Sequence, residues 1–252
     1  MQDKLDRSSV IWILLGIAAV VAGNVLEGGA IGSIVQGTAA VIVFGGTAGA
    51  TLLSFPFTDV SRAVLSLREV FFGSRPKSER VIRQIIDFSV IGRRNGLIAL
   101  ESELELVEDP FLRRAIRLAV DGMNHKMLRE TLEREIATYE DERRREAKVW
   151  ETAGGFAPTV GILGAVLGLI HVMENLTDPS KLGAGIAVAF VATVYGVGSA
   201  NLVLLPLSKK LHNRIDDELC QRELILEGVI GIQSGVNPYY LEQRLRSFVE
   251  GK

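Results

Sequence analysis

The chain has 252 residues, of which 48% are hydrophobic and 23% are charged, and its formal net charge is −2. The mean hydropathy is positive, at +0.26, so the charged residues must be separated from long apolar segments. The single cysteine, Cys220, excludes an internal disulfide framework. The arginine run 143–145 is flanked by acidic residues on both sides, so we expect no nucleic-acid partner, which would require an uncompensated basic surface.

Two apolar segments come first in the chain, from Val10 to Leu26 and from about Ile31 to Phe55. About 20 residues at ~1.5 Å each cross a hydrocarbon core of about 30 Å, so both segments are predicted to span a membrane. The turn between them, Glu27-Gly28-Gly29, contains no Lys or Arg. Trp12 lies near the start of the first segment, where an interfacial aromatic residue is expected. We assign residues 1–56 to a short cytoplasmic start and these two spans.

A charged segment follows and is assigned to residues 57–152. It holds 18 of the 28 basic residues and 18 of the 30 acidic residues. Apolar residues recur in it at helical spacing, which predicts a helical cytoplasmic domain. Its last part, from His125 to Trp150, is predicted to be one long charged helix. Neither proline nor glycine occurs after it until Gly154-Gly155, so this helix is expected to continue almost directly into the membrane.

Two more apolar runs, Gly154 to Met173 and Leu182 to Pro206, contain no Asp, Glu, Lys or Arg. We assign residues 153–207 to a third and a fourth span, and residues 208–252 to cytoplasmic C-terminal helices. Both runs are rich in small residues, which in membranes mark helix faces that approach each other closely. The glycines concerned are Gly161, Gly164, Gly168, Gly185, Gly196 and Gly198.

The distribution of basic residues predicts the orientation of these spans. Two basic residues precede the first span and seven follow Pro206, whereas the two short loops on the other side hold only Lys181. By the positive-inside rule, both termini and the charged segment lie in the cytoplasm. The predicted fold is therefore an all-α, four-span, multi-pass membrane protein with a large helical cytoplasmic domain between spans 2 and 3.

The sequence contains no signal of catalysis: it has no phosphate-binding loop, no metal-ligand cluster and no paired carboxylates in a pocket pattern. We therefore predict neither an enzyme nor a bound cofactor or metal. The spans also lack a carboxylate near the membrane centre, although proton relays normally use one. If this chain conducts protons, the carboxylate must come from another polypeptide.

Four residues of the last two spans allow more than one interpretation. Pro158 and Pro206 either mark helix ends, because proline is favoured in a first turn, or free backbone carbonyls for a functional site. Thr193 and Tyr195 are the most polar residues in the middle of the fourth span. A threonine in such a helix usually bonds the carbonyl four residues earlier, so Thr193 by itself is weak support for an ion site.

Three stretches together resemble the MotA/PomA family of flagellar motor stator subunits. They are GGFAPTVGILGAVLGLIHVMENLTDPSKLGAGIAVAFVATVYGVGSANLVLLPLSKKL, RRNGLIALESELE and EGVIGIQSGVNPYYLEQRLRSF. The resemblance covers nearly the whole chain in the same order. It implies a ring of five copies around two copies of a single-span MotB-type partner, in the bacterial cytoplasmic (inner) membrane. The partner would supply an essential aspartate, and ion flow would turn the ring against the rotor protein FliG in motility and chemotaxis.

The resemblance also implies roles for individual residues of the ion pathway. Pro158 and Pro206 match the two functional prolines of the family, and Thr193 matches the pore threonine beside the partner's aspartate, with Tyr195 close to it in sequence. Sodium-driven relatives carry a threonine where this chain has Ala165. A methyl group offers Na⁺ no oxygen ligand, so we predict proton coupling.

On the cytoplasmic side, Arg93 and Glu101 match the charged pair that engages the rotor, and Arg94 takes the neighbouring basic position. Without the resemblance, a solvated charged surface would explain these residues equally well.

Two alternatives stay open at this point. One is an ExbB/TolQ-type energiser of an envelope protein, but those proteins have three spans and an external N-terminus. Lys4 and Arg7, and the presence of a second span before the charged segment, argue against that assignment. The other alternative is a non-conducting membrane scaffold, which ion flux with a partner would exclude.

Overall fold

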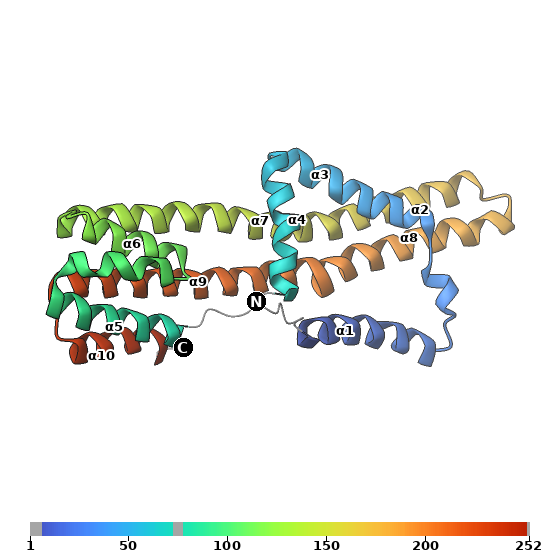
Figure 1. The fold of residues 1–252 in the computed structure, drawn as a ribbon. Coiled ribbons are helices and arrows are strands. Elements are labelled where there is room, and N and C mark those ends of the chain that lie inside the picture. The colour runs from blue at the N-terminus through green and yellow to red at the C-terminus, as the bar shows by residue number, and fades with distance from the viewer. Residues whose placement is uncertain (1–6, 73–77, 251–252) are drawn as a thin grey trace. The chain divides into compact units, whose positions relative to one another are not determined.

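The computed structural model describes residues 7–72 and 78–250, and these ranges contain helices and no strand (Figure 1). The α-helices are α1 (Arg7–Leu26), α2 (Gly37–Ala40), α3 (Gly46–Ser54), α4 (Phe57–Phe72), α5 (Ser78–Asn95), α6 (Pro110–Val120), α7 (His125–Glu174), α8 (Pro179–Ser199), α9 (Leu205–Gln233) and α10 (Pro238–Glu250). Two 3₁₀ segments, η1 (Ile31–Ile34) and η3 (Leu97–Leu106), and two π-helical turns, η2 (Val41–Gly45) and η4 (Ala200–Leu204), complete the chain. The all-α prediction is confirmed.

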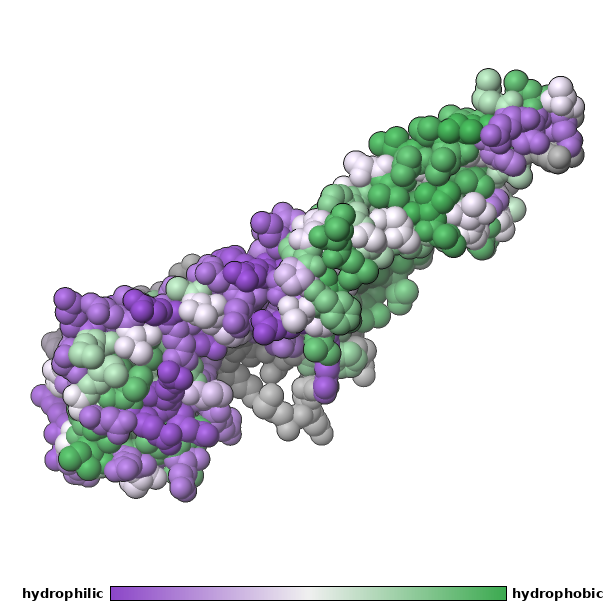
Figure 2. Space-filling view, turned by 90° about the horizontal axis from the view of Figure 1, so that it is seen from above, coloured by the Kyte–Doolittle hydropathy of each residue, from purple (hydrophilic) through white to green (hydrophobic). Residues whose placement is uncertain are grey.

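The chain forms two compact units. The first comprises residues 1–74 and 144–213, and the second comprises residues 75–143 and 214–252. Helices α7 and α9 each contribute to both units. In Figure 2, hydrophobic residues dominate the visible face of the first unit and hydrophilic residues that of the second. The segregation of charge expected from composition follows the two units only in part, because charged residues of α4 and of residues 144–151 belong to the first unit.

Three helical stretches of the described residues are long and apolar enough to cross a membrane: Ile31–Ser54, His125–Glu174 and Leu182–Gln233. The apolar helix Val10–Leu26 is shorter, although α1 as a whole has 20 residues and ends at the predicted Leu26. The continuation of the charged helix into the third apolar run is confirmed, because α7 is one helix of 50 residues.

The second apolar segment is not the single α-helix that its composition suggests. It begins with the short 3₁₀ segment η1, passes through extended backbone at Val35 and Gln36, and becomes α-helical only at Gly37. The backbone around these extended residues is hydrogen-bonded to Tyr195 of α8 (Pro179–Ser199). The Tyr195 hydroxyl donates to the Ile34 carbonyl at 2.7 Å and accepts from the Gln36 amide at 3.2 Å. This contact with the fourth apolar run therefore lies directly before the start of α2.

Helix α4 belongs to the first unit, although its composition resembles that of the charged segment after residue 56. It turns Ala63, Ser66 and Val70 inward, and the Trp150 indole N–H of α7 donates to the Ala63 carbonyl at 3.0 Å. The change in composition near residue 57 therefore comes before the change in packing, which lies after residue 74.

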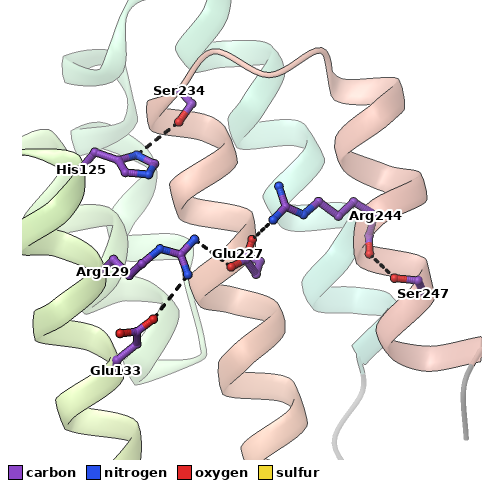
Figure 3. Close-up of polar contacts among 7 residues, drawn as sticks. All are labelled: His125, Arg129, Glu133, Glu227, Ser234, Arg244 and Ser247. Atoms are coloured by element: carbon purple, nitrogen blue, oxygen red, sulfur yellow. Dashed lines mark hydrogen bonds and ion pairs between the residues drawn. The ribbon is translucent and has the colours of Figure 1, made fainter.

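In the second unit, Glu227 of α9 joins three helices (Figure 3). Its carboxylate accepts from Arg129 of α7 at 2.9 Å and forms an ion pair with Arg244 of α10 at 2.5 Å. Arg129 also reaches Glu133 at 3.4 Å. The hydrogen bond that Arg129 donates to Glu227 is the main cause that raises the pKa of Arg129 above its ordinary value. This network holds α7, α9 and α10 together at a largely buried carboxylate.

A second polar contact of this unit surrounds Tyr139 of α7. Its hydroxyl donates to Glu218 at 2.7 Å, and the Arg222 guanidinium lies 3.6 Å from the ring centroid. The same guanidinium lies 4.8 Å from the Phe111 ring. Burial, together with the hydrogen bond to Glu218, raises the pKa of Tyr139 to about 12.

Candidate functional site

Helices α7 and α8 pack backbone against backbone through glycine and alanine. A Cβ atom added to Gly168 of α7 would lie 2.7 Å from the Ala189 nitrogen and 2.8 Å from the Gly185 oxygen of α8. A Cβ atom added to Gly196 of α8 would lie 2.5 Å from the Ala157 oxygen of α7. Real Cβ atoms do not approach backbone so closely, so only glycine fits here. The prediction that small residues mark closely packed faces is confirmed for this pair.

Ala165 and Thr193 lie at one level of this helix pair. Gly164 and Ala192 face each other, since a Cβ on Gly164 would lie 2.7 Å from the Ala192 Cβ. Ala165 and Thr193 follow these two residues in sequence, and both are half-buried. The Thr193 hydroxyl donates to the Ala189 carbonyl at 3.2 Å, as expected for a threonine inside a helix. Its oxygen keeps lone pairs that can still accept a hydrogen bond or contact a cation.

Tyr195 lies one turn of α8 away from Ala192 and anchors the second apolar segment. Besides its hydrogen bonds to Ile34 and Gln36, its ring stacks on Phe44 with centroids 5.7 Å apart. Its hydroxyl therefore both donates and accepts within the chain. Phe44 is a partner that sequence reasoning missed, because no local pattern connects two residues about 150 positions apart.

Both prolines lie inside long helical stretches. Pro158 lies far inside α7, so its interpretation as a first-turn residue is wrong. Because it has no N–H, the Gly154 carbonyl four residues earlier loses its helical donor. Pro206 is the second residue of α9, but α8, η4 and α9 form one continuous helical stretch from Leu182 to Gln233, so Pro206 does not mark a helix end either. The π-turn η4 directly precedes α9 and holds Leu202, whose carbonyl the proline ring would meet in a regular α-helix.

In the second unit, Arg93 and Arg94 end α5, and Glu101 lies in η3. Gly96 connects the two elements with φ of +84°, a conformation that glycine adopts most readily. Two basic residues in the last turn are favourable for the helix dipole. All three charged side chains are exposed, and within residues 7–72 and 78–250 they form no ion pair or side-chain hydrogen bond. They are therefore available to a partner.

Models of two protein families match the chain. The MotA/TolQ/ExbB proton channel family matches residues 103–224, and the Motility protein A N-terminal family matches residues 10–90. Motility protein A of Bacillus subtilis is 32% identical over 249 residues, which cover 98% of this chain and 92% of that protein.

This chain belongs to the MotA family of flagellar stator subunits. Chemotaxis protein PomA of Vibrio alginolyticus is likewise 32% identical over 249 residues, covering 98% of this chain and 97% of PomA. The solved structure of C. jejuni MotAB contains a chain with a TM-score of 0.91 and 34% identity, covering 97% of this chain and 96% of that chain. As a MotA-family member, the chain is a membrane-embedded stator subunit. The N-terminal match, which is to a motility protein model, does not favour the ExbB/TolQ alternative.

The MotA-family residues singled out from sequence fall into two groups. Thr193, Ala165, Pro158 and Tyr195 belong to the first unit, together with Pro206. The charged residues Arg93, Arg94 and Glu101 belong to the second unit. Among the described residues, no cluster of three or more His, Cys, Asp or Glu side chains could hold a metal ion.

Proposed function

We propose that this MotA-family chain forms, with a single-span MotB-type partner, a proton channel whose ion flow generates torque on the flagellar rotor. In this proposal five copies form a ring around two partner helices in the bacterial inner membrane. Each copy has four spans, and both termini lie in the cytoplasm. The proposal rests on membership of the family and on the packing of α7 and α8.

The observation that carries the proposal is the composition of the α7–α8 pair. The helices approach each other backbone to backbone over a stretch without Asp, Glu, Lys or Arg. Proton pathways in membranes normally use an ionisable side chain, so this stretch needs one from another chain. Thr193 and Ala165, which lie at one level of the pair, are the proposed pathway residues nearest to such a carboxylate. The solved MotAB structures are of complexes in which a MotA chain is assembled with MotB, and this supports a MotB-type partner here.

The proposal of protons rather than sodium rests on Ala165. Na⁺ must exchange water for oxygen ligands from the protein, and the methyl group of Ala165 offers none. The hydroxyl of Thr193, which donates to the Ala189 carbonyl, can offer a single oxygen to a cation, and one oxygen does not replace the hydration shell of Na⁺. A proton can pass by transfer between water and a carboxylate and needs no coordination shell.

The rotor contact is proposed for Arg93, Arg94 and Glu101. These residues are exposed and unpaired among the described residues, and complementary charges at a contact guide encounter and set its register. The proposed partner is FliG, with opposite charges facing Arg93 and Glu101.

Charge reversal tests this contact. We expect Arg93→Glu to abolish swimming while leaving ion flux and assembly intact, because the side chain contributes to a contact between proteins rather than to the fold. The change in folding stability should stay within about 0.5 kcal/mol. Arg83→Glu is the matched control, since Arg83 is an exposed arginine of the same helix. Swimming assays with parallel ion-flux measurements decide the matter, and normal swimming of Arg93→Glu would contradict the assignment.

A further inference from the structure

The first unit contains a cavity of about 330 Å³ that the proposed ion pathway does not use. It lies between α3, α4 and α7, and the two π-turns contribute to its walls through Phe44 of η2 and Leu204 of η4. Val64 of α4 and Trp150 of α7 also line it. Single π-turns inside helices are frequent at functional sites, and here two of them, far apart in sequence, line the same cavity.

The surface of the cavity is almost wholly carbon. Three of its polar groups are engaged elsewhere, since Thr51 donates to the Thr47 carbonyl at 2.8 Å and Ser199 to the Gly196 carbonyl at 3.2 Å. The Trp150 N–H donates to α4. The Thr47 hydroxyl is buried and has no hydrogen-bond partner among the described residues, so it is a single polar group free to meet an occupant. A water molecule needs two to four polar partners, so this cavity is unsuited to water and suited to an apolar ligand.

The cavity opens onto an apolar surface. Phe44, Leu52 and Val64 line it and are each about half exposed, and the neighbouring Leu53 and Leu65 are 90% and 73% exposed. An occupant can therefore enter from the surroundings of these side chains. The proposed function places Phe44, Leu52 and Leu53 in the second span, and Val64 and Leu65 of α4 follow it, so the opening lies at the cytoplasmic edge of the membrane. Lipid tails are the most abundant apolar groups there.

The size of the cavity selects among apolar occupants. An α-helix with its side chains is about 10–12 Å wide and does not fit in 330 Å³. A cavity of about 150 Å³ holds one benzene molecule, so this one is too large to be filled by a single side chain of a neighbouring copy. A flexible aliphatic chain matches both the volume and the apolar walls.

We infer that this cavity binds one aliphatic chain of a membrane lipid. The bound chain lies against Trp150 and fills the space between α3, α4 and α7. The inference rests on the membrane placement in the proposed function but not on ion conduction. Filling the cavity replaces the contacts that the wall side chains would otherwise lack, so the lipid chain acts as part of the packing of the first unit.

Tryptophan fluorescence tests this inference, because the chain has only two tryptophans, Trp12 and Trp150. The full chain carrying Trp12→Phe is purified in detergent and titrated with a phospholipid whose acyl chains carry bromine, a contact quencher. We expect saturable quenching of Trp150. Adding Ala48→Leu at the cavity wall should weaken this binding roughly 50-fold, because three methylenes are excluded at about 0.8 kcal/mol each. Val64→Phe, at the exposed mouth, should weaken it as well and serves if Ala48→Leu does not fold.

Two controls keep the outcomes distinct. Ala18→Leu adds the same carbons on α1, outside the cavity, and should leave the titration unchanged. The Trp150→Phe chain reports on Trp12, which is 66% exposed on α1. Quenching of Trp12 without quenching of Trp150 would overturn the inference and indicate that protein, such as a second copy, covers the cavity. Equal effects of Ala48→Leu and Ala18→Leu would also overturn it. Failure to quench either tryptophan would instead contradict the proposed membrane placement.

Discussion

Replacing Gly196 by alanine is expected to loosen the α7–α8 pair and to reduce assembly of the subunit. The added Cβ would lie 2.5 Å from the Ala157 oxygen and 3.0 Å from the Gly161 Cα. Both atoms are backbone, so the helices must move apart rather than a side chain rotate. Overpacking of this kind typically costs about 1–3 kcal/mol. Thermal unfolding of the purified chain in detergent measures the loss, and size-exclusion chromatography measures assembly.

Gly198→Ala is the matched control for this substitution. Gly198 lies two residues further along α8, and a Cβ there meets no atom within 4 Å. Alanine favours a helix over glycine by roughly 1 kcal/mol, so this variant should be as stable as the parent chain or more stable. If Gly196→Ala and Gly198→Ala destabilised the chain equally, the close approach of α7 and α8 would not be the reason for glycine at position 196.

Replacing Glu227 by alanine is expected to destabilise the second unit by about 1–3 kcal/mol, because two arginines lose a hydrogen-bonded, largely buried carboxylate. The Glu227 side chain is only 15% exposed, whereas Arg129 and Arg244 are 34% and 58% exposed. In the variant, both arginines can be partly hydrated. The loss of folding stability should therefore be smaller than for a fully buried ion pair. At about 2–4 °C per kcal/mol for a chain of this size, thermal unfolding should resolve it.

Glu133→Ala removes the other carboxylate that pairs with Arg129. Glu133 is 53% exposed and lies 3.4 Å from Arg129, so its loss should cost about 0–1 kcal/mol, as is usual for a surface pair. A Glu133→Ala effect as large as that of Glu227→Ala would contradict the view that burial at Glu227 sets the strength of the network.

The regular parts of the fold were predictable from sequence because they depend on local composition. The end of α1 at Leu26 and the continuation of the charged helix into the third apolar run follow from apolar length and from the absence of proline and glycine. The 3₁₀ start of the second apolar segment was not predictable, because the hydrogen bonds at its end involve Tyr195 of a helix about 160 positions away in sequence. The π-turns η2 and η4 likewise could not be predicted from one amino-acid sequence.

Some features of the candidate site were also predictable from sequence, and others were not. The helical hydrogen bond of Thr193 and the close approach through Gly168 and Gly196 follow from residue type. The roles of Arg93 and Glu101 do not, since exposed charges in water carry no mark of their partner. Those roles came from the family resemblance, and the structure adds that both side chains are exposed and unpaired within the described ranges.

The most direct test of the central proposal is cytoplasmic acidification in cells that co-express this chain with an unblocked MotB-type partner. We expect fast acidification that is independent of external sodium and is strongly reduced by Thr193→Val. That substitution removes the hydroxyl while keeping the shape of the side chain. Formation of the complex in both cases is verified by co-purification. Sodium uptake in place of acidification would contradict the assignment of protons from Ala165, and the absence of any flux from an assembled complex would contradict ion conduction itself.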